Sequence, residues 1–116
     1  MLAEEKCTAC HAGAPKVAQE EAEELLKEIP GWEIKQFDGE NHLVKRFEFD
    51  DFATALDFTI KVGELAEEAG HHPTLITAWG KVSIHWWTHK IRDLHRNDFI
   101  MAGRTDNLFK NLTSVS

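Results

Sequence analysis

The sequence predicts an α+β fold: a four-stranded antiparallel sheet with three helices packed on one face. Helical and extended patterns follow one another in the order helix, two strands, helix, two strands, helix. A short turn signal joins the two members of each strand pair, which makes each pair antiparallel. The apolar faces of the helices then need a sheet face to cover, and packing on one face is the usual α+β solution.

The first helix and the first strand pair have clear boundaries. Over residues 16–29, apolar positions recur at helical spacing among glutamates, and Pro30-Gly31 ends the helix. Residues 32–37 alternate as a strand does, and Asp38-Gly39 is a hairpin signal because both central residues of a type I′ turn need positive φ. The partner strand is expected over about 42–49.

A long helix follows, capped by Asp50 or Asp51 and reaching about Ala69, with Gly70 as its left-handed C-terminal residue. Its polar stripe consists of Asp57, Lys61, Glu64 and Glu68. The remaining surface is a wide apolar arc suited to lying on a sheet, formed by Phe52, Ala55, Leu56, Thr59, Ile60, Val62 and Leu65.

The second strand pair and the last helix complete the pattern. Strands are expected over 75–79 and 81–89 around a tight turn at Gly80. Asn97 or Asp98 can cap a last helix that runs to about residue 111.

Length and charge restrict the function. The chain of 116 residues supports one domain, expected over 16–112, between a loose segment 1–15 and a frayed tail 113–116. A net charge of −7 argues against direct nucleic-acid binding, and no apolar run approaches the 20 or so residues of a membrane span. The N-terminus has no secretory signal, so we expect a cytoplasmic protein. Tyrosine is absent, which leaves proton chemistry to histidines, carboxylates, lysines or cysteines.

The densest chemical signal is Glu67 followed by His71-His72-Pro73, where the long helix ends. The helix dipole favours a protonated imidazole there, and Pro73 biases His72 toward an extended backbone. Glu67 precedes His71 by one turn on the same side of the helix, where a carboxylate could orient the imidazole. The simpler alternative is that both histidines are polar residues at a helix exit.

A second signal is Thr88-His89 at the end of the fourth predicted strand, where a side chain can project into a cleft. Trp86 and Trp87 point to opposite faces, and core packing is the simpler interpretation of both. The other four histidines are interpreted as surface or packing residues: His11, His42, His85 and His95.

Metal and haem sites are alternatives. Cys7-Thr-Ala-Cys10-His11 matches the pattern for covalent haem attachment, but that chemistry needs export. The same three residues could form part of a zinc site, and His71, His72 and His89 could form an open one. The interpretation we favour is an N-terminal segment with reduced thiols and no metal.

The chain resembles the pterin-4a-carbinolamine dehydratase family. The residues that carry the resemblance are Glu67, His71-His72-Pro73, Trp79, Lys81-Val82, Thr88-His89 and Asp98, and their spacings match the family without gaps from His71 to Ala102. The stretches Trp79-Gly-Lys-Val82, Trp86-Trp87 and 95–102 look most like proteobacterial members. The chain departs from many members at Asp93-Leu94-His95, where His95 is a poorer helix cap than Ser or Thr.

The resemblance implies an α+β fold and dehydration of 4a-hydroxytetrahydropterin to quinonoid dihydropterin, without a cofactor or metal. It implies His71 and His89 as the acid–base groups and His72 as a pterin-binding residue, while Glu67 orients the site and Pro73 and Thr88 line it. Imidazoles suit both proton transfers because they titrate near neutral pH. It also implies a homodimer or homotetramer and a link to phenylalanine hydroxylase. The rival hypothesis is a non-catalytic dimerisation partner of a transcription factor.

Overall fold

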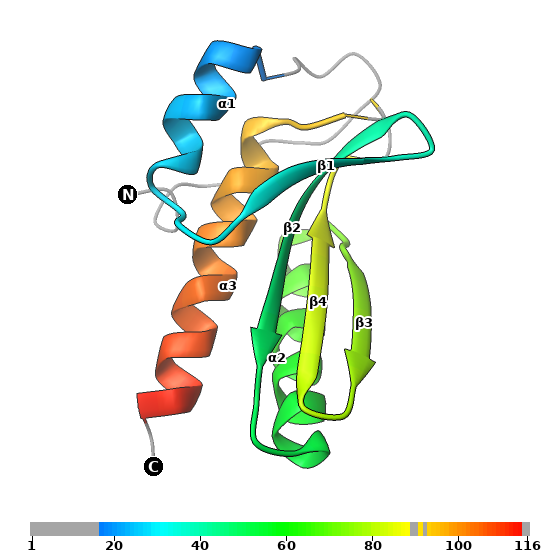
Figure 1. Ribbon diagram of the computed structural model, residues 1–116, viewed down its shortest axis with the longest axis vertical. Helices are drawn as coiled ribbons and strands as arrows, with labels where there is room; N and C mark the ends of the chain where they lie inside the picture. The colour runs from blue at the N-terminus through cyan, green and yellow to red at the C-terminus, as the bar shows by residue number, and fades with distance from the viewer. Residues whose placement is uncertain (1–16, 89–90, 92, 115–116) are drawn as a thin grey trace.

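The computed structural model describes residues 17–88, 91 and 93–114. Along the chain the elements are α1 (Gln19–Leu26), β1 (Glu33–Phe37), β2 (Glu40–Glu48), α2 (Phe52–Ala69), β3 (Thr74–Ala78), β4 (Lys81–Trp86) and α3 (Arg96–Ser114). The strands form one antiparallel sheet in the order β1-β2-β4-β3, and in Figure 1 α2 lies behind it. The predicted α+β class and element order are therefore confirmed.

Local sequence signals explain how the hairpins and α2 form. Asp38 and Gly39 both have positive φ, 52° and 79°, as the predicted type I′ turn requires. The Asp51 carboxylate caps α2 by accepting a hydrogen bond from the Thr54 N–H at 2.7 Å. Gly70 ends α2 in the left-handed region with φ 66°. These turns and caps lie where the sequence predicts them.

The core lies between the sheet and the helices. Leu43, Phe47, Val82, Ile84 and Trp86 point from the sheet toward α2 and α3 and are almost fully buried. Only four residues of α2 are buried: Ala55, Phe58, Val62 and Ala66. The apolar arc of α2 is thus wider than the surface that the sheet covers, and Phe52, Leu56 and Ile60 remain 43%, 43% and 53% exposed.

Several element boundaries differ from the sequence prediction, most clearly in α1, β4 and α3. α1 begins at Gln19 rather than Lys16, and β4 ends at Trp86, before an isolated bridge between Thr88 and Asp93. α3 begins at Arg96 and extends to Ser114, so neither Asn97 nor Asp98 is its N-cap. Within the described residues no helix is long and apolar enough to cross a membrane.

Candidate active site

The end of α2 and the start of α3 meet at one end of the sheet, where β3 begins and β4 ends (Figure 1). This convergence brings His71 to Asp98, 27 residues along the chain. The His71 Nε2–H donates to the Asp98 carboxylate at 2.6 Å, and the two side chains are 5% and 0% exposed. The His71 ring also stacks on Trp86, with planes 4° apart and centroids separated by 5.7 Å. The imidazole is therefore held in one orientation.

Asp98 is the hub of this network. Its second oxygen accepts the Thr88 hydroxyl at 2.9 Å and the His95 N–H at 2.9 Å. The Asn97 N–H in turn donates to His95 Nδ1 at 3.0 Å. His95 is therefore the N-cap of α3, and Asp98 returns its carboxylate to the cap N–H as in a capping box. An imidazole nitrogen thus accepts the bond that a Ser or Thr hydroxyl usually accepts, which explains why α3 begins earlier than predicted.

Glu67 contacts His72 and not His71. Its carboxylate lies 2.6 Å from His72 Nε2, and both side chains are exposed. The expected pairing with His71 fails because Gly70 turns the chain out of the helix, so that His71 points inward and His72 points outward. An exposed pair of this kind adds about 0–1 kcal/mol to stability, so it orients His72 without anchoring the fold.

The remaining predicted site residues have different outcomes. Thr88 is 1% exposed, and its hydroxyl donates a hydrogen bond to the Asp98 carboxylate. Pro73 is half-buried between His72 and the first residue of β3. His89 lies outside the described residues, as do Cys7, Cys10 and His11. Sequence reasoning missed Asp98 as a partner of His71, although its place in the family motif was a signal.

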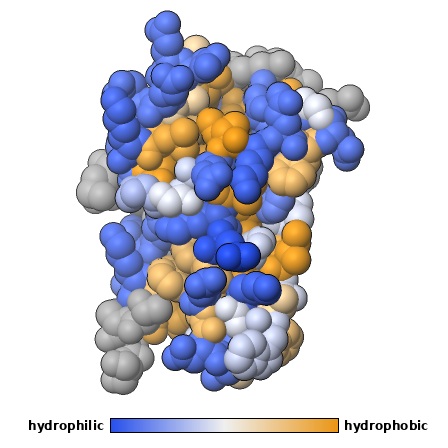
Figure 2. Space-filling view, in the orientation of Figure 1, coloured by the Kyte–Doolittle hydropathy of each residue, from blue (hydrophilic) through white to orange (hydrophobic). Residues whose placement is uncertain are grey.

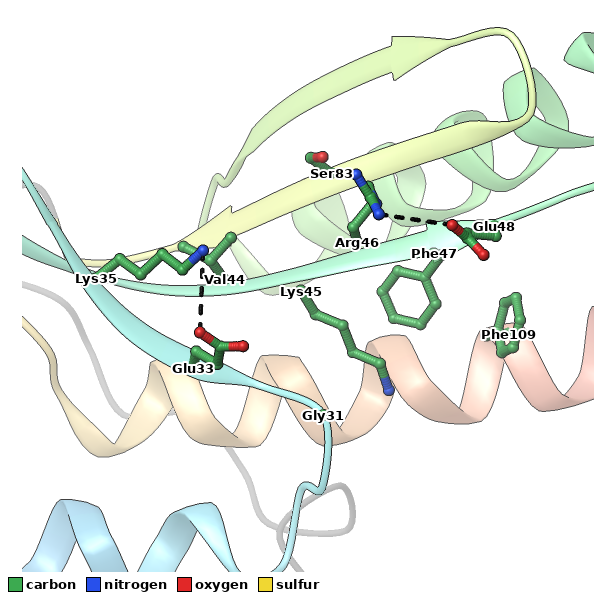
Figure 3. Close-up of a pocket in the computed structure, with 10 residues that line it drawn as sticks. All are labelled: Gly31, Glu33, Lys35, Val44, Lys45, Arg46, Phe47, Glu48, Ser83 and Phe109. Carbon is green, nitrogen blue, oxygen red and sulfur yellow. Dashed lines mark ion pairs between the residues drawn. The ribbon is translucent and has the colours of Figure 1, made fainter.

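In the described part of the chain, no group of three or more His, Cys, Asp or Glu side chains is placed so that it could hold a metal ion. A hollow of about 690 Å³ lies elsewhere, where β1 separates from β2 beside α3 (Figure 3). Each of its three cations pairs with an acid: Lys35 with Glu33 at 3.9 Å, Lys45 with Asp106 at 2.9 Å and Arg46 with Glu48 at 3.6 Å. The hollow includes none of the predicted site residues.

Comparisons with known proteins agree on one family. The sequence profile described as "Pterin 4 alpha carbinolamine dehydratase" matches residues 15–108. A protein from Chlorobium luteolum named "Putative pterin-4-alpha-carbinolamine dehydratase" is 54% identical over 92% of this chain and 94% of its own. A protein of the same name from Marinobacter nauticus is 51% identical over 93% and 97% of the two chains.

Solved structures share the fold. The "transcriptional coactivator/pterin dehydratase" from Brucella melitensis superposes with a TM-score of 0.72 at 28% identity, over 81% of this chain and 98% of that one. A "pterin dehydratase-like protein" described as a RuBisCO assembly factor in the alpha-carboxysome gives 0.58 at 26% identity, over 68% and 89% of the chains. The family profile matches most of the chain, and the relatives from Chlorobium luteolum and Marinobacter nauticus are more than half identical to it. The chain therefore belongs to the pterin-4a-carbinolamine dehydratase family, a family of hydro-lyases.

Proposed function

We propose that this chain removes water from 4a-hydroxytetrahydropterin, with histidine side chains as acid and base. The observation that carries the proposal is the buried His71–Asp98 pair. In the reaction an acid protonates the 4a-hydroxyl and the C4a–O bond breaks, releasing water. A base removes the proton from N5, and the electron pair left there forms the N5–C4a double bond. The product is quinonoid dihydropterin, and the proton that the acid donates is balanced by the proton that the base accepts.

His71 suits one of these proton transfers because Asp98 fixes its tautomer. With Nε2–H donating to the carboxylate, the proton that the ring gains or loses is the one on Nδ1. The carboxylate also stabilises the charged ring after proton uptake, as the acid of a catalytic triad does. The same ring can therefore accept a proton at Nδ1 and later donate it.

The other residues take roles that follow from their places. His89, next to Thr88, supplies the second imidazole, as its position in the family motif implies. His72 is 59% exposed and contacts pterin while Glu67 orients it. Pro73 lines the site beside His72. Thr88 touches Asp98, which supports a positioning role in addition to the pocket-lining role that the resemblance implies.

Single variants test the acid–base assignment. We expect His71→Ala and His89→Ala each to slow dehydration by about 10²–10⁴, the usual contribution of a positioned acid or base. Stopped-flow absorbance with 4a-hydroxytetrahydropterin measures the rate above the spontaneous reaction. His42→Gln is the matched control, because it replaces a buried histidine on another surface. Wild-type rates in both alanine variants would refute the assignment.

The cellular role we propose is recycling of the pterin used by phenylalanine hydroxylase in the cytoplasm, by a homodimer or homotetramer. The exposed apolar stripe Phe52, Leu56 and Ile60 supports self-association, because a monomer gains nothing by exposing it. Light scattering should give a multiple of the 13.2 kDa chain mass, reduced in Leu56→Glu. A coupled hydroxylase assay, in which added protein speeds pterin turnover, tests the recycling role.

A second candidate function is a non-catalytic interaction protein. The same exposed stripe on α2 favours it, and the two structural neighbours are named for coactivator and assembly functions. The dehydration assay separates the two candidates. A folded protein with no turnover above background, and with unchanged binding behaviour in His71→Ala, would favour the interaction protein.

A further inference from the structure

Two histidines outside the candidate active site face one another on the sheet surface opposite the helices. His42 lies on β2 and His85 on β4, diagonal neighbours because His85 pairs with Val44. Their Nδ1 atoms are 3.2 Å apart, and the residues are only 8% and 9% exposed. Figure 2 shows hydrophobic residues interrupted by hydrophilic ones on the sheet side of the molecule. No helix among the described residues covers this face of the sheet (Figure 1), so neighbouring side chains must contribute to the burial of the pair.

Two aromatic rings among the described residues pack against the pair. Trp87 stacks on His42, with ring centroids 3.8 Å apart and planes 9° apart. Phe37, the last residue of β1, stacks on His42 and also contacts His85, each with centroids 4.8 Å apart. The four residues Phe37, His42, His85 and Trp87, here called the histidine latch, therefore connect β1 to β2 and β4. Since β1 pairs with β2 alone, the latch adds the link between β1 and β4 on this face.

The contact between His42 and His85 depends on the protonation state of their two Nδ1 atoms. A hydrogen bond between two Nδ1 atoms needs one of them to donate and the other to accept, so it contains one proton. When the accepting Nδ1 also takes up a proton, the bond is lost: that ring becomes an imidazolium cation, and two N–H groups point at each other. Burial lowers the pKa of His85 below its usual 6.5, and the nearby His42 and Lys35 lower it further.

The described charges around the latch are few. From β1, Lys35 stands opposite His42 and is paired with Glu33 at 3.9 Å. From β2, Glu40 and Arg46 share the face by strand alternation; Arg46 is the other diagonal neighbour of His85 and is paired with Glu48 at 3.6 Å. From β3, the residue opposite His85 is the uncharged Thr74. Lys35 opposes a second protonation, and its partner Glu33 moderates the effect.

We propose that the histidine latch is proton-sensitive: it helps to hold the β1–β2 hairpin against β4 near neutral pH, and the hairpin opens more often in mild acid, when the His42–His85 pair takes up a proton. Release separates Phe37 from the two imidazoles and uncovers the ring of Trp87. The latch acts through the hairpin, and it does not depend on the proposed dehydratase activity.

Proton NMR titration of the wild-type protein is the direct test. We expect the His85 ring to titrate below about pH 6.5, the usual value for histidine, and its signals to shift together with those of His42. Independent titration of both rings near their usual value would overturn the proposal. This measurement needs no variant and so does not depend on any substitution folding well.

Hydrogen exchange tests the release itself. Between about pH 7.5 and about pH 5.5, one histidine that binds a proton only in the open state shifts the opening equilibrium about tenfold. Protection factors of the β1 and β2 amides, corrected for intrinsic exchange, should fall by about that factor in wild type. His85→Gln keeps a hydrogen-bonding group without the titration, so its hairpin protection should change less than about twofold. An equal fall in both proteins would overturn the proposal.

Discussion

Asp98→Asn is the sharpest test of the candidate site, because an amide has one accepting oxygen where the carboxylate has two. Only one side of the substituted side chain can therefore accept hydrogen bonds. The His95 backbone N–H can only donate, so the amide oxygen should stay on that side and on the Thr88 hydroxyl. The amide NH₂ then faces His71 Nε2, which must become an acceptor. The His71 proton therefore moves to Nδ1, and the ring can no longer act as a base there.

The stability cost of this change can be worked from the contacts. Three charge-assisted hydrogen bonds, from His71, Thr88 and the His95 N–H, become neutral ones, a loss of about 1 kcal/mol each. The first turn of α3 also loses a favourable negative charge, worth about 0.3–1 kcal/mol. The expected total is about 3–4 kcal/mol, less than the 5–15 kcal/mol that typically stabilises a domain. Asp98→Asn should therefore fold, whereas Asp98→Ala strands three buried donors and should lose most of its stability.

Three measurements check the reasoning on Asp98→Asn. Urea unfolding measures the free energy, nitrogen-15 NMR of His71 reports the tautomer, and stopped-flow absorbance gives the dehydration rate, which should fall by about 10²–10⁴. Asp106→Asn is the matched control, since Asp106 lies on the same helix and bonds Trp32 and Lys45 instead. A folded Asp98→Asn protein with an unchanged rate would refute the role of the pair. A lost rate with His71 still protonated at Nε2 would refute the tautomer argument.

Three further predictions follow from individual contacts. Thr88→Val removes one hydrogen-bond donor from Asp98 and should lower kcat by less than about tenfold, with KM unchanged. Steady-state kinetics measure both constants, and a rise in KM alone would show that Thr88 contacts the substrate instead. Gly70→Ala forces a side chain into the left-handed region at φ 66° and should cost about 1–2 kcal/mol in urea unfolding. Because the folded-state pKa of His85 is lowered, the unfolded chain takes up that proton first, so stability should fall as pH drops below about 6.5. Urea midpoints of wild type and His85→Gln across this range measure the effect.

The fold could be predicted because its signals are local. The Asp38-Gly39 turn, the Asp51 cap and the Gly70 terminus each depend on a few adjacent residues, and the structure confirms all three. The start of α3 could not be predicted in the same way. Propensity favours Asn or Asp as a cap, but His95 takes that place because Asp98 bonds its N–H from three residues further along.

The partners within the site depend on contacts that spacing along one helix cannot reveal. Helical spacing paired Glu67 with His71, but this holds only while the helix continues, and a left-handed residue at Gly70 separates them. The actual partner, Asp98, is 27 residues away on another helix. The same limit applies to His42 and His85, whose approach requires the register of β2 on β4. A histidine pattern can thus indicate candidate proton-transfer groups, while the carboxylate that fixes the tautomer of His71 depends on how two helices meet.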